Sequence, residues 1–318
     1  MGRLDGQCGG RGVNRQPAFY GEFLVDVLLG KARSASYHPG GAPANSAASA
    51  AGSGARPLLI SSVGADGLGK WLLSCAEAEG IDTRAISVVE NAATSIAFGY
   101  PDRGTNEKFE FIRDADLQIT DEQVLALDPA EIGVLVYGSL SLVGESPMTS
   151  SLKIIKDQVR SSGGLIMCDV NYRESLWESE AQFAGLLRPE VARADIVKAN
   201  VVEAELIVGS VEPPARLAAL LSDLGPRLVV VTAGSAGLVA YAGNTSVDLK
   251  VTRQLSGNGL VGTGDALVGV LASAVSREGL TSVIATTERL TAVLREGMLK
   301  AEAGASAQGA DWRHVAEL

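Results

Sequence analysis

The 318-residue chain contains few cysteines and histidines. Its three cysteines, Cys8, Cys75 and Cys168, are too few and too far apart for a disulfide framework or a zinc site. The two histidines, His38 and His314, exclude a histidine-rich metal site. These absences fit a reducing compartment, and we expect a cytoplasmic protein.

Basic residues and long apolar runs are also scarce. Lys and Arg number 27 against 37 Asp and Glu, a net charge of −10, which argues against a nucleic-acid-binding surface. No apolar run approaches the ~20 residues that span a bilayer, so we expect no membrane segment. Residues 1–16 are rich in Gly and Arg and lack the apolar core of a secretory signal. We expect an irregular tail over residues 1–16 and one domain over residues 17–318.

Short apolar runs alternate with helical patterns along the chain. Buried strands are predicted at Phe23–Leu29, Leu58–Val63, Gly133–Tyr137, Leu165–Asp169, Ile196–Lys198, Leu228–Thr232 and Leu238–Ala242. Helices are predicted at Ala44–Ser53, Lys70–Glu79, Pro147–Arg160, Ala215–Leu224 and Ala266–Arg277. The alternation predicts an α/β fold with a mostly parallel central sheet flanked by helices. Ligands bind such sheets at the carboxyl ends of the strands.

One region, residues 94–117, departs from this pattern. Apolar and polar residues alternate on both sides of Pro101–Gly104, which predicts an antiparallel hairpin. We interpret it as part of a small β lid inserted into the α/β domain.

A glycine-rich motif precedes the last apolar helical pattern. Gly262, Thr263 and Gly264 allow a tight turn whose N–H groups, with the helix N-terminus, form an anion hole. Asp265 follows directly and can accept the proton of an attacking hydroxyl. The same residues are equally compatible with an ordinary glycine turn capped by Asp265.

A second motif lies near the N-terminus. Gly40 and Gly41 permit close backbone approach to a ligand, and Asn45 offers both a donor and an acceptor to a sugar hydroxyl. Asp26 lies within an apolar strand, where a carboxylate is seldom buried without a partner, so we expect it to face a polar ligand. The alternatives are an ordinary βα connection with Asn45 near a helix cap, and a solvent-facing strand edge for Asp26.

Together these motifs resemble the ribokinase/PfkB carbohydrate kinases, and fructokinases in particular. The resemblance extends from Gly21 to about Gly304. The segments that carry it, in chain order, are Gly40–Asn45, Gly64–Gly69, Gly138–Leu142, Asp169–Arg173 with Leu176–Trp177, Lys198–Glu203, Val231–Gly237 and Gly262–Asp265. Their order along the chain carries more weight than any single motif.

The resemblance implies a ribokinase-like fold and an ATP-dependent sugar kinase that phosphorylates a primary hydroxyl of fructose, with ATP and Mg²⁺ as cofactors. It implies that Asp265 is the catalytic base and that Gly262, Thr263 and Gly264 form the anion hole. The residues implied to face the sugar are Asp26, Gly40, Gly41, Asn45, Arg113 and Arg173. The residues implied to contact ATP are Asn200, Thr232, Gly234 and Gly237, and Glu203 is implied to help organise magnesium. Surface ion pairing for the two arginines and a solvated helix position for Glu203 remain alternatives.

The chain also departs from the family pattern. Gly259 and Leu260 stand where the family's second signature opens with Asp-Thr, and Thr263 stands where Ala is usual. We therefore keep two alternatives: a fructokinase-like structural subunit of a larger assembly such as a plastid transcription complex, which would place the protein in plastids, and a 2-keto-3-deoxygluconate kinase. The expected partners are a small sugar and ATP, and a homodimer through the lid is compatible with the resemblance.

Overall fold

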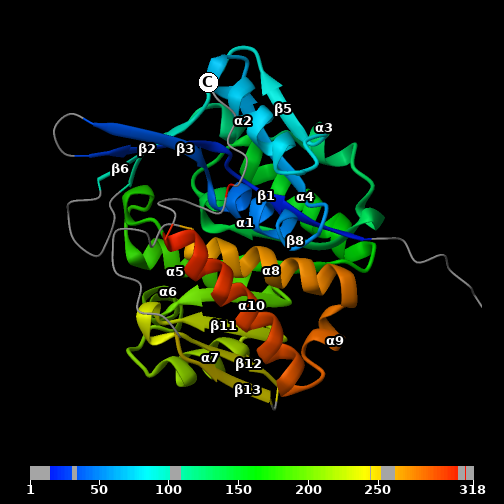
Figure 1. Cartoon of the computed structure of the whole chain (residues 1–318), viewed down its shortest axis with the longest axis vertical. Coiled ribbons are helices and arrows are strands. Elements are labelled where there is room, and N and C mark those ends of the chain that lie inside the picture. Colours follow the sequence, from blue (N-terminus) through cyan, green and yellow to red (C-terminus); the bar gives the residue numbers. More distant parts are fainter. Residues whose placement is uncertain are drawn as a thin grey trace, which may run out of the picture.

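The computed structural model describes residues 15–30, 34–100, 109–243, 245–251, 262–306 and 312. Over these residues the chain forms a nine-stranded sheet with helices on both faces and a separate four-stranded sheet at one side (Figure 1). In spatial order the central strands are β13 (Thr245–Leu249), β12 (Leu238–Ala242), β11 (Leu228–Thr232), β10 (Ile196–Asn200), β9 (Leu165–Asp169), β8 (Ile132–Gly138), β1 (Gln16–Tyr20), β4 (Leu58–Gly64) and β5 (Ile86–Val89). Only β12 runs antiparallel to its two neighbours among these strands. The expected mostly parallel α/β sheet is confirmed.

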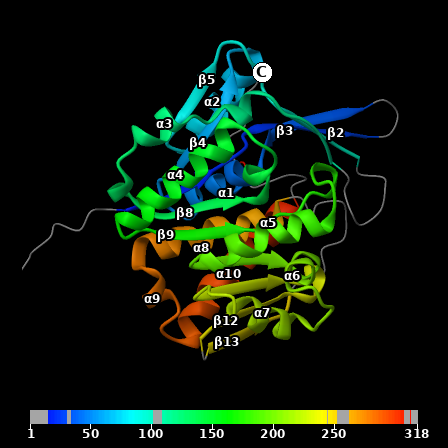
Figure 2. The ribbon, with the colours of Figure 1, turned by 180° about the vertical axis from the view of Figure 1, so that it is seen from behind.

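Helices cover the sheet in two layers. One layer contains α1 (Ala42–Ala51), α2 (Gly67–Ala78), α8 (Thr263–Glu278), α9 (Leu280–Val283) and α10 (Thr287–Ser306) (Figure 1). The other contains α3 (Asp121–Leu125), α4 (Pro147–Ser161), α5 (Glu180–Arg193), α6 (Val201–Val208) and α7 (Pro214–Ser222) (Figure 2). Because successive strand side chains point to opposite faces, Phe19 in β1 packs with the first layer, and Ala18 and Tyr20 pack with the second.

The four-stranded sheet is the lid. Its strand order is β3 (Ala35–Gly40), β2 (Leu24–Leu29), β6 (Ile96–Gly99) and β7 (Phe109–Ile112). The antiparallel hairpin expected within residues 94–117 is present as the β6–β7 pair, and its turn at Pro101–Gly104 lies outside the described residues. The chain enters the lid from β1 and returns through β3 directly into α1, so the lid is joined to the helix that carries Asn45.

One strand prediction needs correction, and one strand was missed. Phe23–Leu29 was expected among the buried strands, but β2 belongs to the lid and four of its six residues are only half-buried. The main sheet instead contains β1, between β8 and β4, which the sequence did not reveal because its five residues begin with Gln and Pro and show no periodicity. The predicted strand Leu238–Ala242 is confirmed as β12, and it runs antiparallel to β11 because a tight turn, rather than a crossover helix, precedes it.

Further elements were not anticipated. Strands β3, β5 and β13 and helices α5, α6 and α10 were absent from the expectation. Strand β1 also begins at Gln16, the last residue of the expected tail, while residues 1–14 lie outside the described part of the chain. None of the helices within the described ranges combines the length and apolar character needed to cross a membrane.

Candidate active site

Helices α1 and α8 bring the two sequence motifs together. They approach closely because both contact faces are small: a Cβ on Gly269 of α8 would lie 2.3 Å from the backbone oxygen of Ser46 in α1. The hydroxyl of Ser49 donates to the backbone oxygen of Ala266 over 2.9 Å. This packing places Asn45 beside Asp265, 220 positions away, and the amide Nδ2 of Asn45 donates to Oδ2 of Asp265 over 2.9 Å.

Asp265 lies in the first turn of α8, directly after the expected glycine motif in the sequence. Gly262 caps the helix with φ of 79°, a left-handed conformation that favours glycine, and its carbonyl accepts from the N–H of Ala266 over 3.0 Å. The N-cap residue is Gly262, so Asp265 is the third residue of α8 and not its N-cap. The alternative of Asp265 as a simple cap is therefore not what the structure shows. The first N–H groups of a helix have no partner within the helix, so this end of α8 suits an anion.

The pKa of Asp265 is raised to about 6. Burial is the main cause and the carboxylate of Asp169 is the second; the Asn45 hydrogen bond, Lys198 and Arg173 act in the opposite direction. A carboxylate with a pKa near 6 is ionised at neutral pH and is a stronger base than an ordinary aspartate. The environment of Asp265 therefore suits proton abstraction from a hydroxyl.

A buried ion pair lies beneath the glycine motif. Nζ of Lys198 in β10 is 2.9 Å from Oδ1 of Asp169 at the end of β9, and both side chains are almost fully buried. Burial alone would lower the pKa of Lys198, but Asp169 and Glu203 raise it above its usual range. A Cβ on Gly264 would lie 2.7 Å from Nζ of Lys198. The ammonium thus adds positive charge directly under the helix end expected to bind an anion.

The residues expected to face a sugar lie on the lid side of this helix end. Asp26 in β2 packs against Gly40, where a Cβ would lie 2.3 Å from Oδ2 of Asp26. Gly41 has φ of 98°, and a Cβ there would lie 2.3 Å from the backbone oxygen of Glu22, so glycine is required on both counts. These residues lead directly into α1, which holds Asn45 almost fully buried.

The two expected arginines differ in their surroundings. Arg113 follows β7 and is buried; its Nε donates to Oδ2 of Asp116 over 2.8 Å and its Nη1 to the carbonyl of Leu140 over 3.0 Å. Arg173 follows β9, lies half-buried over the Phe109 ring at 5.8 Å, and lowers the pKa of Asp265. The structure therefore brings Arg173 towards Asp265 and engages Arg113 in a buried ion pair.

The residues expected to contact a nucleotide lie at neighbouring strand ends. Asn200 ends β10 and Thr232 ends β11, and the two are paired in the parallel register. A tight turn follows Thr232 at Gly234–Ala236. At Gly237, φ is 105° and a Cβ would lie 1.9 Å from the backbone oxygen of Leu249, whereas Gly234 borders open space. The edge is an appropriate place for a ligand, since it is the carboxyl edge of the sheet.

Glu203 is buried in α6 rather than solvated. Its Oε2 accepts from the N–H of Asn200 over 2.7 Å, and its Oε1 accepts from the N–H of Tyr172 over 2.9 Å. Asn200 in turn accepts from the N–H of Glu203, which completes a capping box. Among the described residues, no group of three His, Cys, Asp or Glu side chains is arranged to hold a metal ion.

Trp312 also contacts this site. Its Nε1 donates to Oδ1 of Asn45 over 2.9 Å. Its ring is stacked on Phe23 with centroids 6.0 Å apart and an interplanar angle of 3°. Nothing in the sequence pattern pointed to this residue, because it lies outside every motif.

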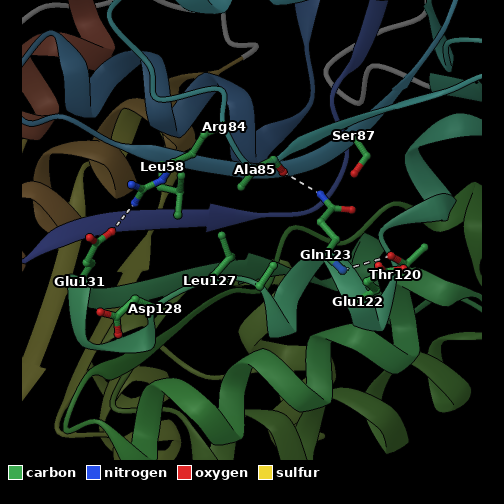
Figure 3. Close-up of a pocket in the computed structure, with 11 residues that line it drawn as sticks. Leu58, Arg84, Ala85, Ser87, Thr120, Glu122, Gln123, Leu127, Asp128 and Glu131 are labelled. Carbon is green, nitrogen blue, oxygen red and sulfur yellow. Dashed lines mark hydrogen bonds and ion pairs between the residues drawn. The ribbon is translucent and has the colours of Figure 1, made fainter.

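A cavity of about 570 Å³ lies elsewhere, between α3, the strands β4 and β5 and the segment before β8 (Figure 3). In its wall, the side-chain Nε2 of Gln123 donates hydrogen bonds to the backbone oxygens of Ser61 and Ala85. At its rim, Arg84 forms an ion pair with Glu131. It lies near the amino ends of β4 and β8, whereas Asp265 lies near the carboxyl edge of the sheet. None of the expected site residues lines it, so it is separate from the candidate active site.

The family is decided by comparison with known proteins. Residues 14–293 match the model of the pfkB family carbohydrate kinases. The chain belongs to this family. The expected enzyme class, a carbohydrate kinase, and the expected ribokinase-like fold are thereby confirmed.

Several named proteins are similar to this pfkB-family kinase. Probable fructokinase-2 of Arabidopsis thaliana is 28% identical over 285 residues, covering 87% of this chain and 85% of that protein. The ATP-dependent 6-phosphofructokinase of Thermoanaerobacterium thermosaccharolyticum is 30% identical over 210 residues, covering 65% of this chain and 63% of that protein. The crystal structure of a fructokinase with bound ATP from Xylella fastidiosa has a TM-score of 0.83 at 22% identity, covering 93% of both chains.

The motifs did not reveal every residue of the site of this pfkB-family kinase. The Asp169–Lys198 pair was seen only as part of two motifs, with no role for either side chain. The available signal was a charged residue at or near the end of each apolar strand. Because the carboxyl ends of parallel strands lie at one edge of the sheet, such residues are expected to lie near one another. That signal could have placed both residues near Asp265.

Proposed function

We propose that this pfkB-family kinase is a fructokinase that transfers the γ-phosphoryl group of ATP to a primary hydroxyl of fructose. The observation that carries the proposal is Asp265, held by Asn45 at the N-terminus of α8 with Lys198 beneath it. A base to take the hydroxyl proton and positive groups to stabilise the transferred phosphoryl group are features that favour phosphoryl transfer.

In this proposal Asp265 accepts the proton of the sugar hydroxyl as the oxygen attacks the γ-phosphorus. The N–H groups of Gly262, Thr263 and Gly264 and the Lys198 ammonium stabilise the negative charge on the transferred group. Asp26, Gly40, Gly41 and Asn45 orient the sugar, and Arg173 lies near the transferred group.

ATP is proposed as the donor, as in the ATP-bound Xylella fastidiosa structure. Its base and phosphates would lie along the strand ends at Asn200 and Thr232 and the turn containing Gly234 and Gly237. Mg²⁺ is bound in many such enzymes mainly by phosphates and water, which is compatible with the residues present. Glu203 would hold the ion through water, since both its oxygens already accept backbone N–H groups.

Free fructose is favoured over a sugar phosphate by the charges of the lid. A second phosphate group would require Lys or Arg side chains at the sugar end of the site. The four described lid strands contain none, and the nearby Arg113 is paired with Asp116.

The test is ADP formation with Mg-ATP across fructose, fructose 6-phosphate, ribose, adenosine and 2-keto-3-deoxygluconate. We expect the highest kcat/KM with fructose. Faster turnover of another substrate would overturn the fructose assignment. Folded protein that forms no ADP with any sugar would favour the structural-subunit alternative.

A further inference from the structure

The Asn45 amide is held at both ends. It is almost fully buried, its Nδ2 donates to Asp265 and its Oδ1 accepts from Trp312, each over 2.9 Å. The oxygen and nitrogen of an amide are otherwise hard to distinguish, and a rotation of 180° exchanges them. An indole N–H is only a donor, so it can face only the amide oxygen.

Trp312 is itself held in place by packing. Its ring lies parallel to that of Phe23, which is fully buried directly before the lid strand β2. The Trp312 side chain is half-buried and packs against the core layer that contains α1 and α8. The N–H therefore has a fixed direction relative to Asn45.

We propose that Trp312 is a positioning residue that fixes the Asn45 amide with its nitrogen towards Asp265. This inference rests on the proposed function, in which Asp265 is the base. Without the indole N–H, the amide can rotate and present Oδ1 to Asp265. An oxygen there repels the carboxylate but accepts a hydrogen bond from the protonated acid, so the rotation favours the protonated form, which cannot act as a base.

The other charged groups around Asp265 do not replace the effect of the amide orientation on the pKa of Asp265. Asp169 on β9 favours the protonated acid, and Lys198 on β10 and Arg173 after β9 favour the carboxylate. All three are present in both orientations of the amide. Loss of the indole N–H is therefore expected to raise the apparent pKa of Asp265 by about one pH unit.

The main test is the pH profile of kcat/KM for Trp312→Phe, which retains an aromatic ring over Phe23 and removes the N–H. We expect the acidic limb to move upward by about one pH unit, with about tenfold lower kcat/KM near pH 5.5 and near-normal values above pH 8. The matched control is Trp177→Phe, because the buried Nε1 of Trp177 has no hydrogen-bond partner among the described residues. A profile for Trp312→Phe that coincides with the wild type and the control would overturn the proposal.

A second measurement does not depend on activity. The chain has three tryptophans, so a ¹⁵N–¹H correlation spectrum contains three indole signals, assignable from the single Phe variants. We expect the Trp312 signal of the substrate-free protein to change with an inflection near the pKa of Asp265, and the inflection to vanish in Asp265→Asn. The absence of an inflection in the wild type would refute the positioning role. An inflection in a protein that phosphorylates no sugar would support the positioning role and reject the proposed function.

Discussion

Asp265→Asn should reduce catalysis and increase stability at the same time. The amide has nearly the same shape and its oxygen can still accept from Asn45, but it cannot take a proton. Loss of a general base lowers kcat by about 10²–10⁴-fold. The stability gain follows from the pKa of Asp265, which burial raises from 3.8 to about 6.

The sign of the stability effect depends on pH. Below pH 3.8 the carboxyl group is protonated in both the folded and unfolded states and has no ionisation cost. Between pH 3.8 and about 6 the unfolded state loses the proton more readily, so folding becomes less favourable. Above pH 6 the full cost is about 3 kcal/mol at 1.36 kcal/mol per pH unit. Because the neutral amide avoids this cost, Asp265→Asn should gain up to about 3 kcal/mol at pH 8 and almost nothing at pH 3.5.

The assay combines steady-state kcat with urea unfolding at both pH values. Glu278→Gln is a control of opposite sign, because hydrogen bonds from Arg289 and then Arg277 lower the pKa of Glu278. That variant should lose a little stability at pH 8 and keep its activity. Near-normal kcat in Asp265→Asn would reject Asp265 as the base. Lower stability of Asp265→Asn at pH 8 would reject the role assigned to burial.

Three further predictions concern the surroundings of Asp265. Lys198→Met leaves the Asp169 carboxylate buried without its ammonium partner and should lower the free energy of unfolding, measured in urea, by about 3–5 kcal/mol. Adding Asp169→Asn should restore part of this stability. Equal stability of the single and double variants would contradict the pairing. Gly269→Ala should separate α1 from α8, lower the free energy of unfolding by about 1–3 kcal/mol and lower kcat. Gly185 borders open space, so Gly185→Ala should lower neither quantity. Potassium should activate the enzyme only weakly, if at all, so kcat should be similar in potassium, sodium and tetramethylammonium buffers of equal ionic strength. The reason is that Gly259 and Leu260, which lie outside the described residues, lack the oxygen side chains of the family pattern. A large, saturable activation by potassium would show that other ligands hold the ion.

The sequence predicted best where local signals and tertiary structure agree. Helix α4 begins at the predicted Pro147, because Ser146 caps it and the apolar pattern follows the helical period. Strand β1 gave no such signal, since its place in the sheet comes from pairing with β4 and β8 on either side, which a short segment does not encode. The strand that contains Asp26 was recognised but placed wrongly, because an apolar run does not specify which sheet it joins.

In the candidate site too, features with a local sequence signal could be predicted and purely tertiary contacts could not. The glycine motif could be predicted around Asp265 because φ of 79° at Gly262 is a local requirement with a local sequence signal. The Asn45–Asp265 contact was not predicted, because no local pattern encodes a contact between residues 220 positions apart. Trp312 could not be predicted at all, since its contacts with Asn45 and Phe23 are purely tertiary.

The 220-residue separation of Asn45 and Asp265 has a consequence for folding. Contacts between distant segments are entropically costly to form and slow the folding of domains that depend on them. During synthesis, α1 leaves the ribosome long before α8 exists, and its small-residue face has nothing to pack against until then. A nascent chain that ends before α8 contains all the strands of the lid and of the central sheet but cannot join the two residues. Phosphoryl transfer should therefore be a late property of the folding chain, gained when α8 docks on α1.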